Sequence, residues 1–150
     1  MANHELISEL EKRRQKALAM GGAEKLAKRK AQGHLNARER LDVLLDPGTF
    51  VESGLFATSH RPEVTDRTPA DGKIAGTGFI DGRMVAVVSN DFTVLGASSS
   101  VVNGKKIRQM REISTRNGAP LIFLGESAGA RMPDRMGAAG RAILGQDPTE

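Results

Sequence analysis

Two segments of the chain run from an apolar strand directly into a turn of small residues and then into a helix. They are FTVLGASSS, residues 92–100, and LIFLGESAGAR, residues 121–131. Small side chains let a ligand come close to the main chain, and a helix N-terminus offers unpaired N–H donors. These two segments predict strand-to-helix turns of an α/β unit, which side by side would hold a developing oxyanion.

The elements around these turns follow one order from residue 73 onward. KIAGTGFI, 73–80, alternates with period two, Asp81-Gly82 predicts a tight hairpin turn, and RMVAVVSND, 83–91, predicts a second strand. A helix is predicted over 101–117, with a buried stripe and an Asn117-Gly118 cap. The stripe consists of Val101, Val102, Ile107, Met110 and Ile113. A strand over 121–124 and a helix over 135–144 complete a strand, strand, helix, strand, helix order.

Residues 1–70 have a different sequence pattern. Helical spacing extends over residues 3–30 with a break at Gly21-Gly22, and Asn36 with Glu39 forms a capping box for a helix over 37–45. Leu41, Leu44 and Leu45 give that helix an apolar face. A short strand over 49–56 and a polar loop over 59–72 follow. We therefore expect a basic helical arm over 1–70 and an α/β unit over 71–150, with the boundary near residue 70.

Composition excludes or disfavours several kinds of site and partner. The chain has no cysteine, and its three histidines, at positions 4, 34 and 60, lack the spacing of metal ligands, so we expect no metal site. Ten of the 22 basic residues lie in the first forty, but aromatic residues make up only 3%, which disfavours nucleic acid as the partner. No apolar run reaches bilayer length, and we see no signal or transit peptide. We expect a cytoplasmic protein, or a mitochondrial matrix protein in a eukaryote.

Three kinds of chemistry come into consideration for this part of the chain. Gly125-Glu126-Ser127-Ala128-Gly129 matches a nucleophile elbow and follows a strand, which allows a serine esterase, but no histidine follows Ser127. A phosphate loop is disfavoured because Ser99 replaces the first glycine of that pattern. The third option is an oxyanion site made of main-chain N–H groups. A plain pair of tight strand–helix connections remains open beside all three.

Three blocks of sequence resemble the carboxyltransferase subunits (beta chains) of biotin-dependent acyl-CoA carboxylases and decarboxylases. The blocks are GHLNARERLDVLLDPGTFVE at 33–52, DGKIAGTGFIDGRMVAVVSNDFTVLGASSS at 71–100, and GAPLIFLGESAGAR at 118–131. This resemblance implies a crotonase-like (ClpP/crotonase) ββα superhelix, of which the chain is the N-terminal portion, preceded by the helical arm. Members of the family are much longer, so we expect a truncated piece that is inactive alone.

The resemblance also implies roles for individual residues. Main-chain N–H groups of Ala128 and Gly129 would form the oxyanion hole, and Ala97, next to Gly96, would supply a second donor. The family usually has glycine where this chain has Ala128, so that donor depends on a negative φ. Gly96, Ser127, Ala130 and Arg131 would contact substrate. Ser127 is expected to cap the following helix, and Arg131 and Asp134 to pair.

The implied activity is carboxyl transfer between N-carboxybiotin and an acyl-CoA, in which the hole stabilises the thioester enolate. Biotin would be carried on a partner protein or domain, and coenzyme A would enter as part of the substrate. The implied partners are a biotin carboxyl carrier protein and a biotin carboxylase, in a homo-oligomer with its active site at a subunit interface. The basic arm is either a solvated helical arm or one that helps receive the CoA phosphates. A non-catalytic CoA-binding scaffold and a serine esterase are the alternatives.

Overall fold

The computed structural model describes residues 2–136. Its α-helices are α1 Ala2–Leu18, α2 Ala23–Ala31, α3 Ala37–Leu44, α4 Val101–Asn117 and α5 Met132–Arg135. Its strands are β1 Val51–Ser53, β2 Lys73–Ile80, β3 Arg83–Asn90 and β4 Leu121–Leu124. Three short 3-10 helices, η1 Pro62–Arg67, η2 Pro69–Gly72 and η3 Leu95–Ala97, lie between them. The helix predicted over 135–144 lies almost entirely beyond residue 136, outside the described residues.

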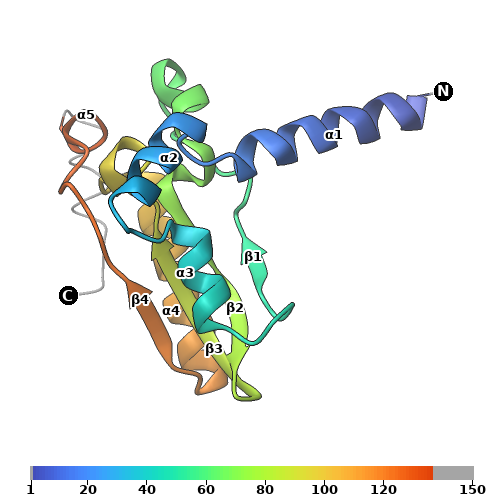
Figure 1. The fold of residues 1–150 in the computed structure, drawn as a ribbon, viewed down its shortest axis with the longest axis vertical. Helices are drawn as coiled ribbons and strands as arrows, with labels where there is room; N and C mark the ends of the chain where they lie inside the picture. Colours follow the sequence, from blue (N-terminus) through green and yellow to red (C-terminus); the bar gives the residue numbers. More distant parts are fainter. Residues whose placement is uncertain (1, 137–150) are drawn as a thin grey trace.

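The four strands form one sheet in the order β1-β2-β3-β4 (Figure 1). β1–β2 and β2–β3 are antiparallel pairs, whereas β3 and β4 are parallel and are joined through α4. The predicted hairpin turn is confirmed, because Asp81 and Gly82 both have positive φ, 50° and 74°. The Asp46 carboxylate accepts both N–H groups of this turn, at 3.0 and 2.9 Å. Because β1 pairs with β2, residues on both sides of position 70 share the sheet.

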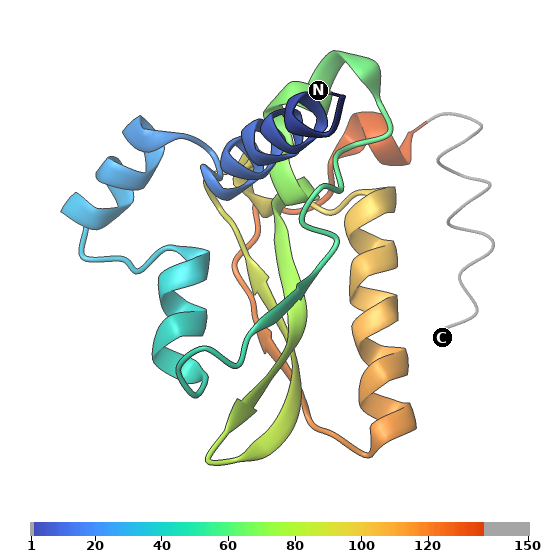
Figure 2. The ribbon, with the colours of Figure 1, turned by 90° about the vertical axis from the view of Figure 1, so that its right-hand side faces the viewer.

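Helices α3 and α4 cover opposite faces of the sheet (Figure 2). Successive side chains of each strand point to opposite faces, so each face of the sheet receives its own set of apolar side chains. One face buries Ile74, Val85 and Val87 against Leu41 and Leu45 of the α3 region. The other face buries the cluster of Ala75, Ala86 and Val88 with Met110 of α4.

Helices α3 and α4 are both capped, and the sequence predicted the box at the start of α3 and the glycine at the end of α4 but not the box at Ser100. Asn36 and Glu39 form a reciprocal capping box at the start of α3. Ser100 and Asn103 form another at the start of α4, and Gly118 ends α4 with a left-handed φ of 60°. The buried stripe predicted for α4 is only partly correct. Met110 is fully buried, but the other fully covered positions are the polar Asn103 and Lys106.

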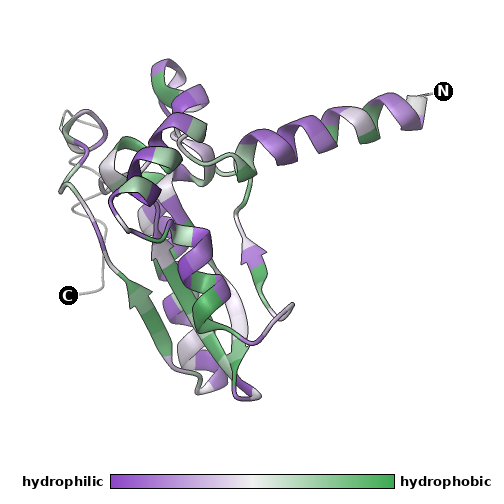
Figure 3. Cartoon of the chain, viewed as in Figure 1, coloured by the Kyte–Doolittle hydropathy of each residue, from purple (hydrophilic) through white to green (hydrophobic). Residues whose placement is uncertain are grey.

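The N-terminal arm differs in part from the prediction. The break at Gly21-Gly22 is confirmed, and α1 projects away from the body while only its C-terminal end, around Ala17, is buried (Figure 1). Figure 3 shows that α1 is mostly hydrophilic, in contrast to β4. The strand predicted over 49–56 shortens to 51–53, and the predicted polar loop contains η1 and η2. No helix within residues 2–136 is long and apolar enough to cross a bilayer.

A buried ionic layer joins η2 to the residues after β4. The Arg131 Nη1 atom donates to Asp71 Oδ1 at 2.6 Å and to Asp134 Oδ2 at 3.2 Å. Asp71 also accepts from the Ser100 hydroxyl and from the Asn103 N–H group. The predicted pairing of Arg131 with Asp134 is confirmed, but both side chains are buried rather than solvated.

Two lysines lie in the same layer. The Lys106 ammonium donates to the carbonyl groups of Gly54 and Ala70, both at 3.0 Å, and to that of Lys73. The Lys73 ammonium donates to the carbonyl of Ala97 at 2.8 Å. Burial lowers the pKa of each lysine from 10.5 to about 8, although neighbouring Asp71 acts in the opposite direction on both.

Replacing the arginine tests this layer. We expect Arg131→Met to lower the free energy of unfolding by about 3–5 kcal/mol, because two carboxylates lose their buried partner. Adding Asp71→Asn should recover part of the loss. Urea denaturation measures both. Arg13→Met is the control, since the exposed Arg13–Glu9 pair contributes at most about 1 kcal/mol. Equal losses in Arg131→Met and Arg13→Met would contradict the ionic layer.

The lysines predict how stability changes with pH. Between pH 8 and 10.5 the unfolded chain keeps protons that Lys73 and Lys106 have lost in the fold. The free energy of unfolding should therefore rise with pH in this window, by about 1–3 kcal/mol. The chain contains no tyrosine and no cysteine, which would titrate in the same range. Urea denaturation at pH 7.5 and 9.5 gives the change, and Lys73→Met/Lys106→Met should flatten it. Falling stability in the wild type would contradict the assignment.

Candidate functional site

The two turns of small residues lie side by side, as the sequence predicts. β3 and β4 are parallel, so their carboxyl ends meet at one edge of the sheet (Figure 1). Main-chain hydrogen bonds link the turns directly. The Ala128 N–H donates to the Gly96 carbonyl, the Ser99 N–H to the Gly129 carbonyl, and the Arg131 N–H to the Ser99 carbonyl, each at 2.8 Å. The turns therefore form one unit.

The turn after β3 has a strained main chain. Leu95, Gly96 and Ala97 all have positive φ, at 46°, 63° and 49°. A side chain in this region costs about 1–3 kcal/mol and persists only when surrounding contacts hold it. Two of the three residues carry such a side chain. This turn is thus held by its partners, and backbone strain of this kind often occurs at functional sites.

The structure places Ala97 differently from the expected second donor. Ala97 is fully buried, and its N–H group donates to the Val94 carbonyl at 2.9 Å. Its carbonyl accepts both the Lys73 ammonium and the Ser127 hydroxyl, the latter at 3.2 Å. In this structure Ala97 links the two turns, and Gly96 beside it is the half-exposed residue.

The turn after β4 is exposed from Ser127 to Ala130. Ala128 does not have a positive φ, so its N–H group keeps the orientation that glycine would allow. This group is nevertheless occupied by the Gly96 carbonyl. The Gly129 N–H donates to the Ser127 hydroxyl at 3.1 Å, and the Ala130 N–H has no acceptor within residues 2–136.

The acceptors of these N–H groups differ in mobility. Releasing Ala128 or Ala97 requires the main chain to move, because their acceptors are carbonyl groups. Releasing Gly129 requires only a rotation of the Ser127 side chain between staggered rotamers. Of the three predicted donors, Gly129 is therefore the one that a ligand oxygen can engage at least cost.

The side chain of Ala128 packs onto Gly96. A methyl group built on Gly96 would lie 2.7 Å from the Ala128 methyl carbon, closer than real contacts allow. The Ala128 methyl group thus occupies the space beside the turn after β3, and position 96 has no room for a side chain.

Ser127 does not cap a helix, which corrects the prediction. α5 begins at Met132, and its N-cap is Arg131, without a side-chain cap bond. The Ser127 hydroxyl instead binds within the turn and to Ala97. None of its hydrogen bonds among the described residues involves a histidine. The elbow pattern around Ser127 therefore lacks a general base in this part of the chain.

Arg131, expected to contact substrate, is 7% exposed and lies in the ionic layer. Its Nε atom donates to the Ser98 hydroxyl at 3.3 Å. Arg131 therefore braces both turns from beneath.

Residues of the basic arm also bind both turns. Arg29 and Arg40 both donate to the Glu126 carboxylate, at 2.7 and 3.2 Å. The N–H group of Gly21 donates to the Thr93 hydroxyl at 2.9 Å. Part of the positive charge of the arm is thus used internally. Lys12, Arg14, Lys28 and Lys30 form no ion pair within residues 2–136.

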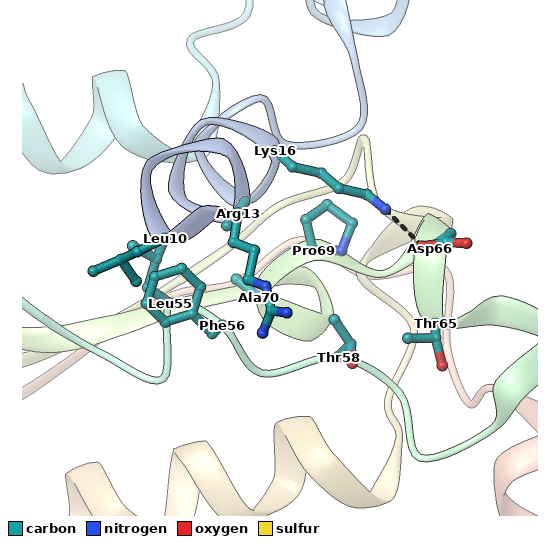
Figure 4. A pocket seen from close by; sticks show the side chains of 11 residues that line it. Leu10, Arg13, Lys16, Leu55, Phe56, Thr58, Thr65, Asp66, Pro69 and Ala70 are labelled. Atoms are coloured by element: carbon teal, nitrogen blue, oxygen red, sulfur yellow. Dashed lines mark hydrogen bonds and ion pairs between the residues drawn. The ribbon is translucent and has the colours of Figure 1, made fainter. Parts of the chain in front are cut away.

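A cavity of about 530 Å³ lies elsewhere, between α1 and residues 55–70 (Figure 4). Leu10, Leu55 and Phe56 contribute apolar walls, and Lys16 pairs with Asp66 at its rim. None of the predicted site residues lines it. No cluster of His, Cys, Asp and Glu that could hold a metal occurs in the described part of the chain.

Sequence reasoning missed three residues of the site: Asp71, Lys73 and Glu126. Each acts through a partner distant in sequence, Arg131, Ala97 and Arg29 respectively. A charged residue at the start or end of a buried strand was the one available signal. Asp71 and Lys73 flank the start of β2, and Glu126 follows β4.

Comparison with known proteins identifies relatives of this fold and site. A family profile described as "Carboxyl transferase domain" matches residues 28–145. The propionyl-CoA carboxylase beta chain of Roseobacter denitrificans is 41% identical over 133 residues, which cover 87% of this chain and 26% of the relative. Methylmalonyl-CoA decarboxylase subunit alpha of Propionigenium modestum is 36% identical over 136 residues, covering 88% and 26%. The chain thus spans about a quarter of the length of these relatives.

Solved structures of carboxylating enzymes also match this chain. Transcarboxylase 12S, with methylmalonyl-coenzyme A and methylmalonic acid bound, matches with a TM-score of 0.83 and 35% identity, covering 95% of this chain and 28% of that one. A single-chain, multi-domain long-chain acyl-CoA carboxylase matches with a TM-score of 0.81 and 33% identity, covering 91% and 15%. The predicted fold, the N-terminal portion of a crotonase-like carboxyltransferase with a helical arm, is confirmed. The chain belongs to the carboxyl transferase domain family.

Proposed function

We propose that the two linked turns serve carboxyl transfer between N-carboxybiotin and an acyl-CoA. The observation that carries the proposal is the exposed turn 127–130, where the Gly129 N–H is held only by a side-chain hydroxyl. The thioester oxygen of the acyl-CoA takes the place of that hydroxyl. As the α-carbon loses its proton, negative charge gathers on this oxygen, and a fixed N–H donor stabilises it.

Ala130 and Gly96 are the residues we propose to extend the donor set, since Ala130 follows Gly129 and the Gly96 carbonyl accepts the Ala128 N–H. Ala130 is exposed and its N–H is unpaired within the described residues, and Gly96 is half-exposed. Ala128 and Ala97 then act through their hydrogen bonds by fixing the turns, rather than by touching substrate.

Carboxybiotin, carried on a partner protein or domain, would supply the carboxyl group to the α-carbon, with a C–C bond formed for the N–C bond broken, and its freed ureido nitrogen would accept the α-proton. In this proposal the residues of the turns hold the thioester oxygen. Arm cations without an ion pair among residues 2–136, Lys28 and Lys30 among them, receive the CoA phosphates.

The remaining assignments follow the relatives. Propionyl-CoA carboxylase and methylmalonyl-CoA decarboxylase act on short acyl-CoAs, and transcarboxylase 12S is a hexamer. We extend to this chain an acyl-CoA substrate, a biotin carrier with its biotin carboxylase, and assembly into a homo-oligomer whose subunits share the site. The arm over 1–70 and the α/β unit over 71–150 then play separate roles, the first in holding CoA and the second in chemistry.

Ser127→Ala separates this function from an esterase. The variant removes the hydroxyl that competes for the Gly129 N–H, so carboxyl transfer should keep its kcat/KM within about threefold or gain slightly. An esterase would lose several orders of magnitude. The assay uses a chimera in which this chain replaces the matching segment of the Roseobacter denitrificans beta chain, with that enzyme's carboxylated biotin carrier.

Three results would decide against the proposal. Loss of carboxyl transfer by more than about 100-fold in Ser127→Ala would give the hydroxyl a chemical role. A wild-type chimera that binds acyl-CoA and its partner without transferring a carboxyl group would favour the scaffold. Hydrolysis of p-nitrophenyl acetate by the chain, lost in Ser127→Ala, would favour the esterase.

The Gly96–Ala128 contact gives a second test. Gly96→Ala adds a methyl group 2.7 Å from the Ala128 methyl and strains a left-handed residue, so it should lower kcat of the chimera about 10- to 100-fold by displacing the turn. Adding Ala128→Gly removes the clash and should restore part of the activity. Gly104→Ala is the control, since nothing lies within 4 Å of its added methyl. Equal effects of Gly96→Ala and Gly104→Ala would show that the contact is irrelevant.

A further inference from the structure

The Lys73 ammonium lies directly beneath the turn after β3. Lys73 opens β2 and is 3% exposed, and its Nζ atom donates to the Ala97 carbonyl at 2.8 Å. The Ser127 hydroxyl donates to the same carbonyl from the turn after β4. β2 and both turns thus meet at one oxygen atom.

This contact stabilises a main-chain conformation that is strained. Ala97 is the last of three consecutive left-handed residues, and relaxation of its φ would turn the peptide groups on both sides of it. The carbonyl of the preceding residue, Gly96, accepts the Ala128 N–H. Movement of Ala97 would therefore pass to Ala128 and to Gly129 beside it.

Keeping a charge at this position is expensive. Burial lowers the pKa of Lys73, and Arg131 lowers it further, while Asp71 raises it. An apolar residue would avoid the desolvation penalty of a buried ammonium. Lys106 of α4 is the other cation in the layer, and its three acceptors are the carbonyls of Gly54, Ala70 and Lys73. Of these two buried lysines, only Lys73 has a hydrogen bond to one of the two turns of small residues.

We propose that Lys73 is a positioning residue for carboxyl transfer: its ammonium fixes the Ala97 peptide and thereby sets where the Gly129 N–H points. This role rests on the proposed function of the turns. Lys73 touches neither substrate nor cofactor, and it acts through Ala97, Gly96 and Ala128 in turn. Loss of the contact should therefore reduce kcat more than it changes KM for acyl-CoA.

Amide hydrogen exchange of the 150-residue chain tests the positioning without any activity. In Lys73→Met, the amides of Ala97 and Ala128 should exchange at least about tenfold faster, since a hydrogen bond from a charged donor is lost. The amides of Val87 and Val88 in β3 report on global opening. Lys106→Met is the matched control, because it removes a buried ammonium that contacts no turn.

The outcomes differ for a positioning and a merely structural lysine. If Lys73 positions the turn, exchange at Ala97 and Ala128 rises relative to Val87 and Val88 in Lys73→Met but not in Lys106→Met. If both variants raise exchange evenly over all four amides, Lys73 is structural only and the proposal is wrong.

Chemical rescue replaces Lys73→Met if that variant does not fold. The chain has no cysteine, so Lys73→Cys carries the one thiol. Alkylation with 2-bromoethylamine in denaturant, followed by refolding, restores a side chain of lysine length with its charge. Alkylation with 1-bromopropane gives the same length without the charge. Slow exchange at Ala97 and Ala128 in the first product alone supports the proposal, and equal exchange in both overturns it.

The chimera completes the test. Lys73→Met should lower kcat about 10- to 100-fold, the scale of a misplaced catalytic group, with KM for acyl-CoA within about threefold. An active chimera whose kcat is unchanged by Lys73→Met overturns the positioning role. A wild-type chimera that transfers no carboxyl group overturns the proposed function instead, and the exchange experiment then still decides whether Lys73 holds the turn.

Discussion

The buried ion pair between Asp71 and Arg131 is the contact on which the rest of the site depends. A carboxylate and a guanidinium are removed from water together, and each must be satisfied by further hydrogen bonds. Asp71 obtains them from Ser100 and Asn103 at the start of α4, and Arg131 from Ser98 and Asp134. The start of β2, the turn after β3, α4 and the turn after β4 are thereby fixed to one another.

This arrangement makes a site out of main chain rather than side chains. Alanine, glycine and serine line both turns, and none of them has an acid–base group matched to proton abstraction. What the turns offer is N–H groups at the edge of a sheet, held by hydrogen bonds from one turn to the other. Main-chain donors of this kind suit an oxyanion, as the proposed carboxyl transfer requires. The buried charges beneath the turns supply the rigidity that such donors require.

Patterns local in sequence predicted most of the fold. Period-two alternation predicted β2, an apolar run predicted β3, Asn117-Gly118 predicted the C-terminal end of α4, and Asp81-Gly82 predicted the hairpin. The meeting of the two turns followed from parallel β3 and β4. Contacts between distant residues were not predictable in this way. Burial of Ala97, the polar face of α4 at Asn103 and Lys106, and the binding of Ser127 to Ala97 depend on partners that no spacing reveals. Ser127 thus looked like a helix cap because its immediate neighbours suit one.

The central claim is that a thioester oxygen replaces the Ser127 hydroxyl at the Gly129 N–H. Backbone NMR of the ¹⁵N-labelled chain during titration with propionyl-CoA tests it most directly. If the claim holds, the Gly129 amide proton shifts downfield on binding, while the amides of Ala97 and Ala128, tied to carbonyl groups, shift little. A titration in which acyl-CoA binds but leaves the Gly129 amide unchanged would contradict it.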